Sequence, residues 1–145
     1  MYKHILIPTD GSTLSEMAAM QGVAFAKSID AKVTGITVSV PFHTFALDPT
    51  MVTDTAGQYE EDCAARAATY LGVLEKAARV AGVPYEGFHV VREHPYEAII
   101  DAAKRQGCDL IFMASHGRKG MSALVLGSEN VKVLTHSKVP ILVCR

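Results

Sequence analysis

The sequence predicts a single α/β domain built on a doubly wound, parallel, five-stranded sheet. Short apolar runs alternate with longer stretches of helical periodicity along all 145 residues, and this alternation implies right-handed βαβ units. The runs at residues 4–9 and 110–114 are almost continuously apolar, as expected of strands that are buried on both faces. A chain of this length with 49% hydrophobic residues can bury one sizeable core. We therefore assign residues 1–145 to one domain.

The amino-terminal half contains two of the predicted strands. Residues 4–9 form the first, and residues 32–40, which are rich in valine, isoleucine and threonine, form the second. Between them, Thr13 and Glu16 have the spacing of a capping box, which predicts the start of a helix. Residues 41–57 keep no sustained period and hold two prolines, so they predict a mobile loop. The expected buried stripe of the first helix consists of Leu14, Met17, Ala18, Ala24 and Phe25.

The carboxyl-terminal half is predicted to add three helices and three strands. A long helix over residues 58–81 ends at Gly82 and Pro84, a typical stop signal. Its expected inner face consists of Ala67, Tyr70, Leu71, Leu74, Ala78 and Ala81. The elements that follow are a strand at residues 85–91, a helix at 95–106 opened by Pro95, a strand at 110–114, a glycine-marked connection at 115–127, a helix at 128–136 capped by Ser128, and a strand at 140–144.

The composition argues against several classes of protein. A formal net charge of −1 gives no electrostatic reason to expect nucleic acid or an anionic membrane as partner. The three cysteines are widely spaced and odd in number, which favours a reducing compartment over a disulfide framework. The chain shows no secretory signal and no apolar run of about 18 residues that would span a bilayer. We expect a soluble, cytoplasmic protein.

Ligands of open α/β sheets lie beyond the carboxyl ends of the strands, where the strand order reverses. Two segments fall there, residues 8–12 after the first strand and residues 114–130 after the fourth. In the second, Gly117 and Gly120 would let backbone approach a ligand, and Gly127 and Ser128 open a helix whose first amides suit an anion. Arg118 and Lys119 add positive charge. The spacing alone leaves open whether the glycines only turn the chain and Ser128 only caps the helix.

The first segment carries Asp10, whose carboxylate would accept hydrogen bonds from ribose hydroxyls or help to hold a metal; its alternative role is to cap the first helix. The sequence contains no P-loop and no G-x-G-x-x-G after the first strand, which argues against a P-loop protein and a dinucleotide-binding fold of the usual type. No aspartate ends the third strand, as a phospho-acceptor receiver domain would require. Ser115 follows a strand but lacks a G-x-S-x-G context, and we expect the adjacent His116 not to turn back onto it. The histidines and cysteines show no metal-ligand spacing.

Ala114-Ser115-His116-Gly117, followed after nine residues by Gly127-Ser128, resembles the universal stress protein family. The resemblance extends over the whole chain, from the Ile5-Leu6-Ile7-Pro8-Thr9-Asp10 strand end to the closing Val139-Pro140-Ile141-Leu142-Val143 run. The family's ATP-binding branch carries G-x-x-G, nine residues, then G-[ST], and here Ala114 replaces the first glycine. The resemblance implies a Rossmann-like, five-stranded parallel sheet in the order 3-2-1-4-5.

The same resemblance implies a ligand and a site. The ligand would be ATP, AMP or ADP, and any Mg²⁺ would be carried by the nucleotide, with no metal site of the protein's own. Pro8, Thr9 and Asp10 would lie along the adenine and ribose, Val38 would contact the adenine, and Met113 and Ala114 would flank the nucleoside. The phosphates would be held mainly by backbone amides of Gly117, Gly127, Ser128, Glu129 and Asn130. Members of the family usually form homodimers through the last strand, and the apolar run at residues 139–143 is suited to pair with its twin.

These expectations favour a dimeric, ATP-binding stress-response or signalling module. One alternative is a slow ATP hydrolase, for which Asp10 and His116 are the only candidate catalytic groups, so that at most weak hydrolysis is expected. The other is a dimeric interaction protein that binds no nucleotide, which Ala114 favours and which Gly117, Gly127 and Ser128 oppose.

Overall fold

The computed structural model describes residues 1–45, 55–116 and 127–145. Its strands form one parallel sheet in the order β3-β2-β1-β4-β5, which confirms the predicted fold class and strand order. The strands are β1 (His4–Pro8), β2 (Lys32–Ser39), β3 (Tyr85–Val91), β4 (Leu110–Ala114) and β5 (Ile141–Cys144). Each lies within a residue or two of its predicted range, because uninterrupted apolar runs mark buried strands clearly.

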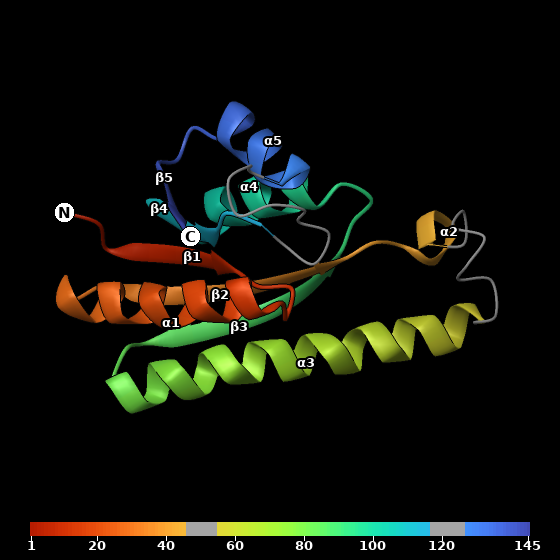
Figure 1. The fold of residues 1–145 in the computed structure, drawn as a ribbon, viewed down its shortest axis with the longest axis horizontal. Helices are drawn as coiled ribbons and strands as arrows, with labels where there is room; N and C mark the ends of the chain where they lie inside the picture. Colours follow the sequence, from red (N-terminus) through yellow and green to blue (C-terminus); the bar gives the residue numbers. More distant parts are fainter. Residues whose placement is uncertain (46–54, 117–126) are drawn as a thin grey trace.

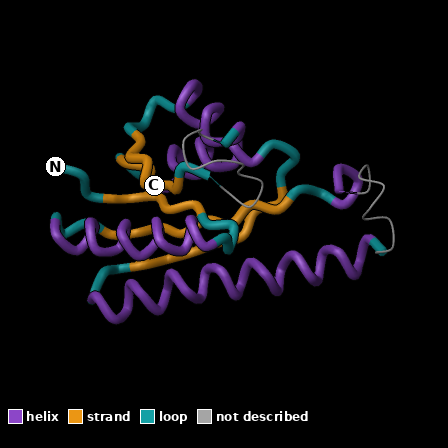
Figure 2. Tube along the Cα trace, viewed as in Figure 1, coloured by secondary structure: helices purple, strands orange, loops and turns teal. Residues whose placement is uncertain are grey.

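Helices cover both faces of this sheet. They are α1 (Thr13–Ser28), α2 (Phe42–Phe45), α3 (Ala56–Ala81), α4 (Pro95–Gln106) and α5 (Ser128–His136). Helices α1 and α3 lie side by side on one face, and α4 and α5 lie on the other (Figure 1). The strands therefore form a central layer between two helical layers (Figure 2). None of the described helices is long and apolar enough to cross a membrane.

The core follows from the alternation of side chains along the strands. In β1, Ile5 and Ile7 pack with α1 and α3, whereas Leu6 packs toward α4 and α5, and all three are fully buried. Two apolar clusters result, one on each face of the sheet. Ala114 belongs to the cluster beside α1 and α3, and Met113 to the cluster beside α4 and α5. The last two residues of β4 thus have side chains on opposite faces.

Two predictions about α1 are wrong. Its N-cap is Ser12, whose hydroxyl accepts the Ser15 N–H, and not Thr13. Met17 is 48% exposed and Ala24 is also exposed. The buried face is made of small residues because α1 lies close to the sheet: a Cβ on Gly22 would come within 2.6 Å of the Ile7 side chain. These buried residues are Ser15, Ala18, Ala19, Gly22, Val23 and Ala26.

The predicted loop at residues 41–57 is partly helical. Helix α2 packs its aromatic rings against Tyr59 of α3, with the Phe45 ring stacked at 4.2 Å between centroids. Helix α3 begins two residues earlier than predicted because Thr55 caps it by accepting the Gln58 N–H. Residues 46–54 lie outside the described part of the chain. Of the predicted inner face of α3, Ala67, Leu74 and Ala78 are buried, Tyr70, Leu71 and Ala81 are partly exposed, and the buried Tyr59 and Cys63 were not predicted.

His4, the first residue of β1, is a buried titratable group in the sheet. Its Nε2 lies 2.7 Å from the Thr34 hydroxyl, and burial lowers the pKa of the His4 imidazole below its usual 6.5, with a further contribution from Lys32. A lowered folded-state pKa means that the unfolded chain takes up the proton first. The contribution of His4 to the free energy of unfolding is therefore present above about pH 6.5 and is lost as the pH falls below it.

We predict that the free energy of unfolding decreases between pH 7 and 5.5, and that His4→Gln makes this decrease smaller. Urea unfolding at several pH values measures the effect. His136→Gln, on the exposed side of α5, is the control. An equal pH dependence in both variants would rule out His4 as the source. His89, whose pKa burial also lowers, acts in the same direction.

Candidate functional site

The two polar segments singled out in the sequence follow neighbouring strands. β1 pairs with β4 through Leu6 and Ile111, and with β2 on its other side. The strand order therefore reverses between β1 and β4. At such a point the chains leave the sheet toward opposite faces, so a crevice opens beyond the carboxyl ends. Thr9 to Ser12 directly follow β1, and Ser115 and His116 directly follow β4, so both segments lie at the edge of the sheet where such a crevice is expected.

The segment after β1 is held by its own hydrogen bonds. The Thr9 hydroxyl shares a hydrogen bond with the Ser15 hydroxyl at 3.1 Å, and the Asp10 N–H donates to that same Ser15 oxygen at 3.3 Å. The Ser12 N–H donates to Asp10 Oδ1 at 3.0 Å, which closes an Asx turn. On the opposite side, the Thr37 hydroxyl donates to the Thr9 carbonyl at 2.9 Å. Thr9 is thus buried and holds the loop through its hydrogen bonds. Asp10, in the turn of this loop, is fixed in position and partly exposed.

Gly11 is required at the centre of this loop. Its φ of +77° lies in the left-handed region that L side chains rarely adopt. A Cβ there would also stand 2.2 Å from a ring carbon of Tyr70, a residue of α3. The loop that carries Asp10 is therefore pressed between α1 and α3 at a position that only glycine fits.

Beyond β4, Ser115 and His116 form a buried pair. The Ser115 Oγ and His116 Nδ1 are 2.8 Å apart, and both residues are 3% exposed. This contradicts the prediction that His116 would not turn back onto Ser115. The His116 imidazole lies against the hydroxyl of the preceding residue, and both side chains are buried. Among the described residues, His116 Nε2 has no hydrogen-bond partner. Burial of both side chains argues against Ser115 as a nucleophile on a substrate from solvent.

Helix α5 begins directly over this pair. The Gly127 N–H donates to the Ser115 carbonyl at 3.0 Å, and the Asn130 side-chain amide donates to the Ala114 carbonyl. The N-cap of α5 is Gly127, and Ser128 is the first helical residue, so the prediction of Ser128 as the cap is wrong. Among the described residues, none accepts a hydrogen bond from the amides of Ser128, Glu129 or Asn130. Such amides at the positive end of a helix suit an anion.

The fold itself does not require glycine at position 127. Its φ of −61° and ψ of 152° are open to any residue. A Cβ there would meet only ordinary contacts, at 3.8 Å from His116 Cα and from the Ser115 carbonyl oxygen. Gly127 directly precedes the first amides of α5, which have no acceptor among the described residues. This is where a ligand would need close approach to the backbone.

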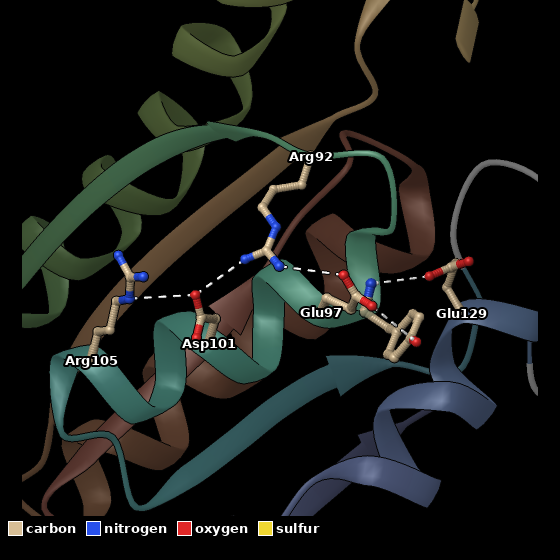
Figure 3. A network of polar contacts seen from close by, with 6 residues as sticks. Arg92, Glu97, Asp101, Arg105 and Glu129 are labelled. Atoms are coloured by element: carbon tan, nitrogen blue, oxygen red, sulfur yellow. Dashed lines mark hydrogen bonds and ion pairs between the residues drawn. The ribbon is translucent and has the colours of Figure 1, made fainter.

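The side chain of Glu129 turns away from those amides. Its Oε2 accepts the Tyr96 N–H of α4 at 3.0 Å, and its Oε1 lies 3.4 Å from Lys132 Nζ. Figure 3 shows this carboxylate directed toward the first turn of α4. The predicted contribution of Glu129 to an anion site is thus confined to its backbone amide.

The other predicted residues lie at the ends of three strands. Pro8 ends β1 and is partly exposed. Val38 of β2 is partly buried and packs with the cluster on the α4 and α5 face, to which Met113 also belongs. The Ala114 methyl group belongs to the core on the α1 and α3 face. Gly117, together with Arg118, Lys119 and Gly120, lies outside the described residues.

Two surface cavities of the described residues lie away from this crevice. One, of about 490 Å³, is lined by Arg92, Tyr96, Glu97, Ile100, Asp101 and His136. The other, of about 360 Å³, lies where α2 meets α3 and includes Phe42, Tyr59 and Cys63. In the described ranges, no group of three or more histidine, cysteine or carboxylate side chains could hold a metal ion. Neither cavity lies at the point of strand-order reversal, where the first amides of α5 lack an acceptor among the described residues.

Comparison with known proteins gives a consistent result. The universal stress protein family model matches residues 1–145. A universal stress protein of Thermus aquaticus, named for its place 3′ of a QAH/OAS sulfhydrylase, is 30% identical over 145 residues and covers 100% of both chains. The structure of hypothetical protein MJ0577, from Methanocaldococcus jannaschii, has a TM-score of 0.82 and 27% identity over 99% of this chain and 95% of that one. A universal stress protein in complex with cAMP shares the fold, with a TM-score of 0.67 and 21% identity over 99% and 97% of the two chains.

Proposed function

Because this chain belongs to the universal stress protein family, we propose that it binds an adenine nucleotide, foremost ATP, in the crevice beyond β1 and β4. As a cytoplasmic homodimer, it would act as a stress-response or signalling module. A relative with the same fold was crystallised with cAMP, which makes an adenine nucleotide the natural candidate for the crevice.

The observation that carries this proposal is the amino-terminal end of α5. Its first amides have no acceptor among the described residues, its N-cap is bonded to the end of β4, and the described surroundings of Gly127 leave room for a side chain there. The buried Ser115 carbonyl and the Ala114 carbonyl anchor the helix from below, so the amides are held in fixed positions. Fixed N–H donors at the positive end of a helix favour phosphate over a neutral ligand.

The remaining residues supply a place for the nucleoside. Pro8, Thr9 and Asp10 would line the adenine and ribose from β1, and Val38 would contact the adenine from β2. Met113 and Ala114 would lie on the β4 side, and Gly127, Ser128, Glu129 and Asn130 would bind the phosphates, joined by Gly117. The partly exposed carboxylate of Asp10 would accept a ribose hydroxyl or approach a Mg²⁺ bound to the phosphates.

The Ala114 substitution fits this proposal. The Ala114 side chain is 6% exposed and belongs to the apolar cluster beside α1. A methyl group in the core does not occupy the space in front of the α5 amides. The alternative of a member that binds no nucleotide therefore loses its main structural argument.

We assign no catalytic residue. Ser115 and His116 are hydrogen-bonded to each other and buried, and Asp10 Oδ1 accepts the Ser12 amide. A general base for hydrolysis must reach a water beside the phosphate. Weak ATP hydrolysis is the most that this arrangement supports.

The proposed dimer would form through β5. This strand lies at the edge of the sheet and pairs with β4 on one side only. Its residues Ile141, Leu142 and Val143 remain partly exposed, and α5 presents Val131 and Leu134 to solvent. An apolar edge strand of this kind is suited to pair with a second copy.

Thermal unfolding with ATP and Mg²⁺ tests the proposed function. A ligand at a hundred times its dissociation constant adds about 2.7 kcal/mol to the free energy of unfolding. For a domain of this size, the midpoint should rise by roughly 5–10 °C. An unchanged midpoint at millimolar ATP, in protein verified to carry no co-purified nucleotide, would contradict nucleotide binding.

A further inference from the structure

Helix α4 begins without a capping side chain of its own. Its N-cap is His94, which makes no side-chain capping hydrogen bond, and its first residue, Pro95, has no N–H. The Glu97 and Ala98 amides both donate to the His94 carbonyl, at 3.1 and 3.4 Å. The Tyr96 N–H is thus the first amide of α4 that needs an acceptor from elsewhere.

Glu129 of α5 supplies that acceptor. Its Oε2 accepts the Tyr96 N–H at 3.0 Å, across 33 positions of the sequence. A carboxylate at the amino-terminal end of a helix also interacts favourably with the helix dipole. Glu129 therefore caps a helix to which it does not belong (Figure 3).

The first turn of α4 is itself held in place. Arg92, in the loop before α4, pairs with Glu97 at 3.3 Å and with Asp101 at 3.1 Å, and Arg105 pairs with the same Asp101 oxygen at 3.3 Å. These pairs are partly exposed and individually weak, but they tie the loop to the helix at two successive turns. Glu129 consequently binds to a fixed point, and α5 is fixed through it (Figure 3).

This contact also determines where the negative charge of Glu129 lies. Glu129 is the second residue of α5, next to the amides of Ser128 and Asn130. A carboxylate folded back over those amides would take the place of a phosphate and would repel it through its negative charge. The Tyr96 N–H and Lys132 hold it on the α4 side instead, where Lys132 Nζ also lies 5.5 Å from the Tyr96 ring centroid.

We propose that Glu129 is a positioning residue for the phosphate groups of the nucleotide. By capping α4, it holds the amino-terminal end of α5 open and in register with the end of β4, and it keeps its own charge away from the α5 amides. This inference rests on the proposed function and adds to it the residue that couples the crevice to α4. Glu129 itself touches no ligand through its side chain.

Glu129→Ala and Glu129→Gln test the proposal by titration with ATP and with adenosine, which lacks phosphate. We expect Glu129→Ala to weaken ATP binding about tenfold and adenosine binding less than about twofold, because only the phosphates use the α5 amides. Glu129→Gln keeps an acceptor for the Tyr96 N–H, so its ATP affinity should stay within about threefold of the parent protein. Glu61→Ala, which removes an exposed carboxylate from α3 on the other face of the sheet, is the matched control and should leave both affinities unchanged.

Three results would overturn the proposal, two from the titrations and one from hydrogen exchange. Equal loss of ATP and adenosine affinity in Glu129→Ala would mean a general structural role, and a gain of ATP affinity in both variants would mean that Glu129 acts only through its charge. Amide hydrogen exchange of the ligand-free protein decides the matter independently of nucleotide binding. Glu129→Ala should speed exchange at Tyr96 and at residues 128–131, and unchanged exchange there would overturn positioning even if the parent protein bound no ATP.

Discussion

Replacement of Gly11 by alanine is expected to lower the free energy of unfolding by about 2–5 kcal/mol. Two costs add up at this position. A left-handed backbone costs a non-glycine residue about 1–2 kcal/mol, and the φ of Gly11 is +77°. The new methyl group would also stand 2.2 Å from the Tyr70 ring, and such overpacking typically costs about 1–3 kcal/mol. Urea unfolding at neutral pH measures the sum.

Gly107→Ala separates the two costs. Gly107 ends α4 with a φ of +70°, but no atom lies within 4 Å of the position of its Cβ. This variant should show only the backbone cost of about 1–2 kcal/mol. In a double-mutant cycle, Tyr70→Ala should remove the additional cost of Gly11→Ala. Equal destabilisation by Gly11→Ala and Gly107→Ala would show that Tyr70 does not press on the loop.

Gly127→Val is expected to weaken ATP binding by about ten- to hundredfold, because hydrogen bonds to a charged group are worth about 1.5–3 kcal/mol each. The branched side chain would stand directly before the amides of Ser128 and Glu129, to which the phosphates are proposed to bind. The backbone at this position suits valine, and its Cβ would meet only ordinary contacts. The domain should therefore remain folded, with a stability loss of about 1 kcal/mol or less for the poorer N-cap. Calorimetric titration measures the affinity.

Gly57→Val is the control for this substitution. Gly57 lies in the first turn of α3, and no atom of the described residues lies within 4 Å of the position of its Cβ. Because valine has a higher helix propensity than glycine, Gly57→Val should not lower stability, and it should leave ATP affinity unchanged. Undiminished ATP binding by folded Gly127→Val would remove the end of α5 from the site.

The sheet was predictable from the sequence because its signal is local. Continuous apolar runs at β1 and β4 are typical of strands covered on both faces. The order of the strands has no such local signal, and it came from the family resemblance. The two segments of the crevice were predictable for the same reason as the strands, since each directly follows one of them.

The face of α1 was mispredicted because hydrophobicity is not the only criterion for burial. Met17 is strongly apolar yet exposed, whereas Gly22 and Ser15 are buried. Close packing against Ile7 and Phe112 admits only small residues in the middle of the helix. Ser15 is buried because its hydroxyl holds the Thr9 and Asp10 loop.

The contacts that complete the site join distant residues and leave little trace in the sequence. Glu129 caps α4 across 33 positions, and the only local signal was the absence of a capping side chain before Pro95. The pair formed by Ser115 and His116 depends on burial at the end of β4, which the sequence did not reveal. Tertiary packing decides such contacts more than local propensity does.

A titration of the isotopically labelled protein with ATP and Mg²⁺, followed through its backbone amide resonances, tests the central claim most directly. We predict that the largest shifts occur at Asp10 and Gly11 after β1 and at Ser128, Glu129 and Asn130 at the start of α5. These are the polar segments at the carboxyl ends of β1 and β4. Shifts concentrated instead around Arg92, Tyr96 and His136, which line the cavity beside α4, or no shifts at millimolar ATP, would contradict the proposed site.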